Sequence, residues 1–195
     1  MPIRVIGGSA RGRQLKLVPG DTTRPVMDRV KEALFNIVSG DILDSTFLDL
    51  FAGTGSIGIE ALSRGAKKAV FVEREKKAVE TIQDNLVAAK LAERAVVRKA
   101  DVLSVLKQVP AEHYDFIYIA PPQYKGIWLQ VLYALDANPA WISPETAIIV
   151  QIDPSEETEQ QFKNFEAYDQ RRYGRTLLWF FGAHESESEN VTPKE

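Results

Sequence analysis

The chain has 195 residues, of which 45% are hydrophobic, and a formal net charge of −3. This length and apolar content predict one main domain with a full core. Because the sequence contains no cysteine, disulfides, thiol nucleophiles and cysteine-ligated metal centres are excluded. With only two histidines, no metal site is expected. The opening residues lack a signal-peptide core and no apolar run approaches a membrane span, so we expect a soluble cytoplasmic protein without a membrane partner.

Charge is unevenly distributed along the chain. Residues 1–39 contain seven Lys or Arg against three acidic residues, whereas residues 183–195 contain four Glu against one Lys. Within residues 1–25, two short alternating apolar stretches separated by Gly7-Gly8 predict a hairpin or arm. Its cations suit phosphate contacts, although the solvated face of a small hairpin would carry similar charges. We therefore predict a basic amino-terminal arm over 1–25 and a disordered acidic tail over 183–195.

The remainder, residues 26–182, predicts one α/β domain. After Pro25 the chain turns helical, with Val30, Leu34 and Ile37 spaced to form one apolar face. Strands and helices then alternate, which indicates a mainly parallel sheet with helices on both faces. Two strands flanking Gly174 predict an antiparallel hairpin at one edge, an ending usual in methyltransferase domains. The predicted strands are Phe47–Phe51, Lys68–Glu73, Ala95–Ala100, Tyr114–Ala120, Thr146–Ile152, Tyr168–Tyr173 and Thr176–Phe181, and the later helices are Lys76–Lys90, Val102–Gln108 and Trp128–Leu135.

A glycine-rich turn is the most informative stretch of the sequence. The apolar run Phe47–Phe51 predicts a buried strand, and Gly53, Thr54 and Gly55 follow it directly before a helical pattern. Gly53 and Gly55 permit backbone angles closed to other residues, and Gly58 lets the new helix pack closely on its strand. The first N–H groups of such a helix are free to bind a ligand. The turn therefore predicts a nucleotide-binding site.

Two cofactors fit this turn. Gly53, Gly55 and Gly58 match the dinucleotide pattern G-x-G-x-x-G, and Glu73 lies twenty residues past the first glycine, where such folds bind a ribose. Asp49 favours S-adenosylmethionine over NAD(H), because a carboxylate this close to the turn would repel a pyrophosphate but attract a sulfonium and an ammonium group. Alternatively, Asp49 only caps backbone N–H groups of the turn.

Further polar residues follow the other predicted strands, and ligands of open parallel sheets bind beyond the carboxyl ends of the strands. Glu73 would accept hydrogen bonds from both ribose hydroxyls of the cofactor. Asp101 would accept one from the adenine amino group. Taken singly, each acid could equally be a helix cap or a solvated residue. Their coincidence with the glycine turn at one sheet edge favours a cofactor site.

The fourth strand is followed by Pro121-Pro122-Gln123-Tyr124. Two prolines fix the backbone and remove two N–H donors, so the carbonyl groups here are acceptors aimed in advance. The exocyclic amino group of a base reacts better when acceptors hold both of its hydrogens and orient the nitrogen for attack. Tyr124 can stack on that base. This segment predicts methyl transfer to a nucleic-acid base.

Together these segments resemble the bacterial small-subunit (16S) ribosomal RNA guanine-N2 methyltransferase family of class I S-adenosylmethionine-dependent enzymes. The resemblance spans Ile3–Phe181 and implies a Rossmann-like, seven-stranded methyltransferase fold. It also implies methyl transfer from S-adenosylmethionine to the N2 amino group of a guanine in ribosomal RNA, presented on an assembling small ribosomal subunit. The segments that carry it are the Ile3–Gly12 opening, the helix from Arg24-Pro25 to Asn36, the Asp49–Gly55 turn, the Pro-Pro pair and Tyr173-Gly174.

The resemblance and the charge pattern give a set of candidate site residues, with a monomer as the expected state. The candidate cofactor-binding residues are Asp49, Phe51, Ala52, Gly53, Thr54, Gly55, Ser56, Glu73, Arg74, Asp101 and Val102. The candidate catalytic residues are Ala120, Pro121, Pro122 and Tyr124. The candidate contacts to substrate RNA are Arg4, Arg11, Arg13, Arg24 and Arg29.

One position departs from the family pattern. Members usually have Asp or Asn before the two prolines, whereas this chain has Ala120, whose side chain cannot accept a hydrogen bond. Loss of one aimed acceptor typically costs about 3 kcal/mol of transition-state stabilisation, or roughly a hundredfold in rate. The backbone carbonyls remain, and Gln123, Tyr124 or Asp28 are candidates to supply the missing contact.

Three alternatives stay open at this point. An adenine-N6 DNA methyltransferase fits the glycine turn and the two prolines, although the chain lacks a separate target-recognition domain. An NAD-dependent oxidoreductase fits the glycine pattern alone. A catalytically weak RNA-binding homologue that has kept the fold is supported by Ala120 alone.

Overall fold

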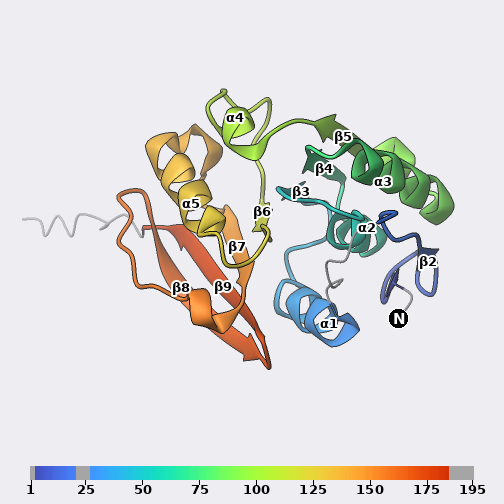
Figure 1. The fold of residues 1–195 in the computed structure, drawn as a ribbon, viewed down its shortest axis with the longest axis horizontal. Coiled ribbons are helices and arrows are strands. Elements are labelled where there is room, and N and C mark those ends of the chain that lie inside the picture. The colour runs from blue at the N-terminus through green and yellow to red at the C-terminus, as the bar shows by residue number, and fades with distance from the viewer. Residues whose placement is uncertain (1–2, 21–26, 185–195) are drawn as a thin grey trace, which may run out of the picture.

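The computed structural model of the chain describes residues 3–20 and 27–184. It has a seven-stranded sheet in the order β5-β4-β3-β6-β7-β9-β8 and a separate two-stranded sheet of β1 and β2 (Figure 1). The strands are β1 (Ile3–Arg4), β2 (Gln14–Leu15), β3 (Thr46–Asp49), β4 (Lys68–Glu73), β5 (Ala95–Lys99), β6 (Phe116–Ile119), β7 (Ala147–Ile152), β8 (Phe165–Tyr173) and β9 (Thr176–Ala183). The helices are α1 (Asp28–Ile37), α2 (Ser56–Ser63), α3 (Lys76–Ala89), α4 (Val102–Leu106) and α5 (Ile127–Ala137), with 3₁₀ turns η1 (Ala92–Arg94), η2 (Pro139–Trp141) and η3 (Pro154–Glu156).

The large sheet has helices on both faces, as the alternating pattern predicts. Strands β5, β4, β3, β6 and β7 run parallel, whereas β9 is antiparallel to both β7 and β8. One apolar cluster packs α1, α2 and α3 against the sheet, and a second packs α4 and α5 on the other face. The strand order changes direction between β3 and β6, so the carboxyl ends of these two strands are where a ligand is expected. The predicted Rossmann-like fold is confirmed.

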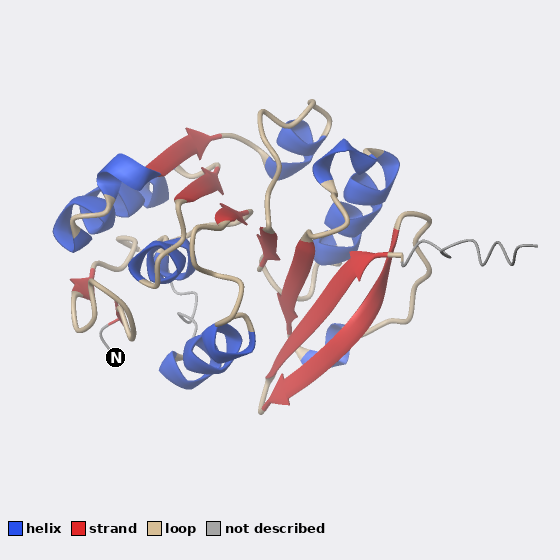
Figure 2. Cartoon of the chain, turned by 180° about the vertical axis from the view of Figure 1, so that it is seen from behind, coloured by secondary structure: helices blue, strands red, loops and turns tan. Residues whose placement is uncertain are grey.

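The carboxyl-terminal hairpin is longer than predicted. Strand β8 begins at Phe165 rather than Tyr168, and β9 continues to Ala183, the first residue of the predicted tail. Figure 2 shows this hairpin as a long antiparallel pair at one edge of the sheet. Because Leu177 at the start of β9 pairs with Ile152 at the end of β7, the hairpin turn lies at the carboxyl edge of the parallel strands. Residues 185–195 of the predicted tail lie outside the described residues.

Helix α1 buries a face that only partly matches the predicted one. Val30 and Leu34 are buried as expected, but Ile37 is 41% exposed, and Lys31 and Phe35 are buried in its place. The aromatic ring of Phe35 packs against the core, and the lysine has a buried anionic partner. An apolar-spacing argument assigns a lysine to solvent, so the predicted face was right for Val30 and Leu34 and wrong for Ile37.

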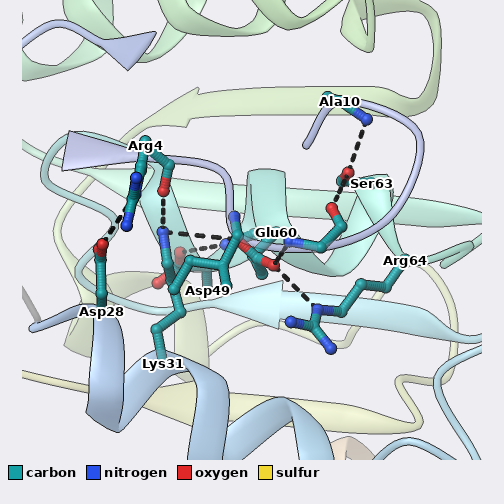
Figure 3. A network of polar contacts seen from close by, with 11 residues as sticks. Arg4, Ala10, Asp28, Lys31, Asp49, Glu60, Ser63 and Arg64 are labelled. Carbon is teal, nitrogen blue, oxygen red and sulfur yellow. Dashed lines mark hydrogen bonds and ion pairs between the residues drawn. The ribbon is translucent and has the colours of Figure 1, made fainter. Parts of the chain in front are cut away.

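That buried partner is Glu60 on α2, which is fully buried and joins three parts of the chain (Figure 3). Its carboxylate lies 3.4 Å from Lys31 Nζ and accepts a 2.8 Å hydrogen bond from Arg64 Nε. It also accepts hydrogen bonds from the backbone N–H groups of Ile6 and Gly7, at 2.8 and 2.7 Å. Burial lowers the pKa of Lys31, and the charge of Glu60 opposes that shift.

The amino-terminal hairpin packs into the core rather than lying apart from it. Its paired strands comprise only two residues each, shorter than the alternating stretches suggest, because the backbone after β1 turns to bond Glu60. Ile3, Val5 and Leu15 are buried in the same apolar cluster as α1 and α2. Residues 21–26, which connect this hairpin to α1, lie outside the described residues. Among the residues described, no helix combines the length and apolarity that crossing a membrane requires.

Replacing Gly58 by alanine tests the close packing of α2 on the sheet. A Cβ at this position would overlap the ring of Phe71 on β4. We expect Gly58→Ala to lower the free energy of unfolding by about 1 to 3 kcal/mol, although alanine favours helices over glycine. Urea unfolding measures the change, with Gly40→Ala as the control because its Cβ would meet nothing within 4 Å. A variant as stable as the parent would contradict the packing role.

Candidate active site

The glycine turn lies between the carboxyl end of β3 and the start of α2. Gly53 and Gly55 have φ angles of 54° and 76°, in the left-handed region that favours glycine. The turn is closed by a 2.7 Å hydrogen bond from the Gly55 N–H to the Ala52 carbonyl. The Gly53 N–H donates to Glu73 Oε2 at 2.9 Å, so the acid at the end of β4 contacts the turn directly. Two of the predicted strand ends are thus brought together.

Asp49, at the end of β3, is 2% exposed and accepts a 3.2 Å hydrogen bond from the Gly58 N–H. This contact agrees with the alternative that Asp49 caps backbone N–H groups, and it leaves one carboxylate oxygen for other partners. Burial raises the pKa of Asp49 to about 7, with a further rise from the charge of Glu73, while the Gly58 N–H opposes the shift. Asp49 is therefore a group whose charge a bound cation would stabilise.

Asn85 on α3 fixes the turn from the other side, and the sequence analysis missed it. Its Nδ2 donates to the Thr54 carbonyl at 2.9 Å and to the Lys16 carbonyl at 3.1 Å, and its Oδ1 accepts from the Lys16 N–H at 2.7 Å. Asn85 is only 1% exposed. The available signal was an amide on the apolar face of a helix, between Ile82 and Leu86.

The other predicted cofactor residues lie on the same edge. Asp101 follows β5, is exposed, and caps α4 by accepting from the Ser104 N–H at 2.9 Å. Asp101 therefore has the helix-cap role that the sequence analysis gave as the alternative to cofactor binding. Its second carboxylate oxygen is still available. Val102 is buried in α4, whereas Arg74 is exposed beside Glu73. The partly exposed Phe51 packs against the apolar cluster under α4 and α5.

The segment after β6 is held by residues that the sequence analysis did not single out. Tyr124 has a left-handed φ of 62° and donates its hydroxyl hydrogen to Asp153 Oδ2 at 2.8 Å. Arg175, from the β8–β9 turn, donates to the Tyr124 hydroxyl oxygen at 3.0 Å. Two hydrogen bonds from Ser155, one from Tyr124 and the nearby charge of Arg175 lower the pKa of Asp153 to about 2. Tyr124 is thus anchored by two other segments, the one after β7 and the β8–β9 turn.

Several polar groups near this segment already have partners. Ala120 is partly buried and Pro121 is buried. Ile119, the residue before Ala120, pairs with Val150 on β7, and Gln151 is the next residue of that strand. The Oε1 of Gln151 accepts a 2.6 Å hydrogen bond from the Tyr118 hydroxyl. Asp28 accepts a 3.0 Å bond from Arg4. Gln123 and Pro122 are exposed.

The predicted RNA contacts are exposed where the structure describes them. Arg4, Arg11, Arg13 and Arg29 all have exposed side chains, and Arg4 pairs with Asp28. Arg24 lies outside the described residues. A second group of cations at the β8–β9 turn was missed, although their spacing around Gly174 was visible in the sequence. These are Arg171, Arg172 and Arg175, all exposed.

Comparison with known proteins identifies the family. The family described as conserved hypothetical protein 95 matches residues 3–182 of the chain. The chain belongs to this family. Ribosomal RNA small subunit methyltransferase D of Haemophilus influenzae is 39% identical over 153 residues, which cover 77% of this chain and 79% of that protein. The family is therefore one of rRNA methyltransferases, as the resemblance implied.

Solved structures agree with the family assignment. The structure of yhhF from Escherichia coli has a TM-score of 0.82 and 30% identity, covering 94% of this chain and 98% of that one. An RNA methyltransferase from Salinibacter ruber, solved with S-adenosyl-L-homocysteine, has a TM-score of 0.63 at 16% identity, over 87% of this chain and all of that one. This second likeness concerns the fold, which is that of a methyltransferase.

The raised pKa of Asp49 predicts a pH-dependent stability. The folded protein keeps a proton on Asp49 up to about pH 7, whereas an unfolded Asp loses it near pH 4. Stability should therefore fall as pH rises between about 4 and 7, by up to about 4 kcal/mol for this group. Asp49→Asn should remove that loss, because its amide oxygen still accepts from Gly58. Urea unfolding of both proteins at several pH values measures the difference, and parallel curves would contradict the prediction.

Proposed function

We propose that the protein transfers a methyl group from S-adenosylmethionine to the N2 amino group of a guanine in small-subunit (16S) rRNA. The observation that carries the proposal is the meeting of two segments at one sheet edge. One is the glycine turn bonded to Glu73, and the other is the Pro-Pro segment that ends in the anchored Tyr124. Family membership supports rRNA as the substrate.

The cofactor assignment draws on the chemistry of the turn. S-adenosylmethionine supplies an activated methyl group when bound. Asp49 would face its ammonium or sulfonium charge, Glu73 its ribose hydroxyls and Asp101 its adenine amino group. The left-handed glycines leave the backbone open to close approach by a ligand. The S-adenosyl-L-homocysteine bound to the Salinibacter ruber protein of the same fold also supports this cofactor.

RNA binding is assigned to two groups of cations. The first is the amino-terminal arm with Arg4, Arg11 and Arg13, and Arg29 at the start of α1. The second is the tip of the β8–β9 hairpin. Both views place that tip and α1 at the same end of the molecule (Figures 1 and 2). A ribosomal RNA, folded and negatively charged along its backbone, fits a site with cations from separate elements.

Product analysis tests the proposed function against two of the three alternatives that the sequence left open. The protein is incubated with S-adenosylmethionine and, in parallel, unmodified small ribosomal subunits, their RNA and DNA. We expect N2-methylguanosine from the small-subunit or RNA sample, detected by mass spectrometry after digestion. N6-methyladenine from DNA would instead identify an adenine methyltransferase. No product, with S-adenosylhomocysteine binding shown by calorimetry and 16S rRNA binding shown separately, would indicate a catalytically silent RNA-binding protein. Calorimetry with NADH tests the oxidoreductase alternative.

The hairpin tip offers a direct test of RNA binding. We expect Arg171→Ala with Arg172→Ala to weaken binding to unmodified 16S rRNA and to flatten its dependence on salt. Each phosphate contact contributes about 0.7 to 0.9 to the slope of log affinity against log salt. Two lost contacts would make the weakening roughly tenfold larger at 50 mM than at 200 mM salt.

The matched control removes two cations from the opposite edge of the sheet. Lys67 precedes β4 and Lys163 precedes β8, and both are exposed. Lys67→Ala with Lys163→Ala should leave the salt slope near that of the parent. Lysine at positions 171 and 172 should restore it, because lysine keeps the charge. If Arg171→Ala with Arg172→Ala and the parent had equal slopes of log affinity against log salt, the hairpin tip would not be part of the RNA-binding surface.

A further inference from the structure

Glu156 is an anomaly in the polar contacts of the molecule. Among the described residues, its Oε2 is the only buried side-chain oxygen or nitrogen without a hydrogen-bond partner. Buried polar atoms in folded proteins nearly always have partners, so an exception needs an explanation. One explanation is that the partner belongs to a bound ligand.

The position of Glu156 fits a ligand site. Two segments line a hollow of about 280 Å³: the one after β7, with Glu156 and Thr158, and the one after β6, with Tyr124, Gly126, Trp128 and Leu129. Ligand pockets for drug-sized molecules typically measure about 300 to 1,000 Å³, so this hollow suits a single base. In Figure 1 the loop before α5 and the short turn after β7 lie next to each other.

The two segments that line the hollow are bonded to each other. Tyr124 donates to Asp153, and Asp153 accepts from the Ser155 N–H at 3.0 Å and from its hydroxyl at 2.8 Å. The N–H of Glu156 donates to the Asp153 carbonyl at 2.9 Å. Glu156 is therefore held at a fixed place relative to Tyr124, the aromatic expected to stack on the target base.

Of the three candidates named for the acceptor missing at Ala120, Tyr124 and Asp28 are bonded to other protein groups, and Gln123 is exposed. The Tyr124 hydroxyl donates to Asp153 and accepts from Arg175. Asp28 pairs with Arg4, and Gln151 accepts from Tyr118. Glu156 is partly exposed and is one of the residues that line the same hollow as Tyr124, and its buried Oε2 has no donor.

We propose that Glu156 recognises the target guanine by accepting hydrogen bonds from its N1–H and N2 amino groups. The inference rests on the proposed function and adds the residue that selects the base. Guanine presents two adjacent donors on this edge, which match the two oxygens of a carboxylate. Adenine presents an acceptor, N1, beside its amino group, and a carboxylate repels that acceptor. Glu156 therefore favours guanine over adenine.

Substitution of Glu156 by glutamine tests the proposal at nearly constant shape. We expect Glu156→Gln to slow formation of N2-methylguanosine in 16S rRNA by roughly a hundredfold, the usual effect of losing one aimed group. Affinity for S-adenosylhomocysteine should not change. Glu159→Gln is the matched control, an exposed glutamate of the same segment, and it should keep the parent rate. An unchanged rate in Glu156→Gln would overturn the proposal.

A binding measurement separates this inference from the proposed function. Saturation-transfer NMR compares guanosine and adenosine 5′-monophosphates, which share the same phosphate, with saturating S-adenosylhomocysteine. We expect the parent to prefer the guanosine nucleotide and Glu156→Gln to lose that preference. If the preference depends on Glu156 but no methylated RNA forms, the proposed function fails and the inference stands. If the parent shows no preference, the inference fails whatever the RNA product.

Stability distinguishes recognition from a structural role. If Glu156 serves only the ligand, replacing an unpartnered carboxylate should leave the urea midpoint of Glu156→Gln equal to the parent's or higher. A lowered midpoint together with lost activity would identify a structural residue and overturn the proposal.

Discussion

The buried carboxylate of Glu60 is the interaction on which the arrangement of the amino-terminal half depends. It lies on α2, the helix that begins at the glycine turn, and it bonds the arm through Ile6 and Gly7 and α1 through Lys31. Removing one partner of a buried ion pair costs about 3 to 5 kcal/mol, because the other charge stays buried without compensation. Glu60 is therefore one side chain that bonds the arm, α1 and the helix of the glycine turn together.

A comparable constraint holds the other half of the site. Asp153, at the end of β7, accepts from Tyr124 and lies 3.5 Å from Arg175, which joins the loop after β6 to the tip of the β8–β9 hairpin. Asn85 likewise joins the glycine turn to the amino-terminal arm, through its hydrogen bonds with Thr54 and Lys16. Each candidate RNA-binding element is thus bonded to a segment at the sheet edge. RNA contacts made far from the reacting base can in this way orient the residues beside it.

The sequence predicted the features that depend on local pattern. Buried strands, the glycine turn and the acids that follow the strands are encoded within short stretches, and the parallel sheet brings their ends together. It could not predict contacts between distant segments, such as Tyr124 with Asp153, 29 residues away, or with Arg175, 51 residues away. The burial of Lys31 on α1 was missed for the same reason, because only the fold supplies Lys31 with Glu60.

Ala120 shows how a departure from a local pattern can be compatible with the same chemistry. In a parallel sheet the carboxyl ends of neighbouring strands lie side by side, so a group lost after β6 can be replaced by one after β7. The segment after β7 holds a carboxylate without a donor, while the hydroxyl of Tyr124 is already engaged. Leaving such an acceptor unpaired lowers the stability of the ligand-free protein. That cost is explained if the carboxylate is kept for the edge of a base.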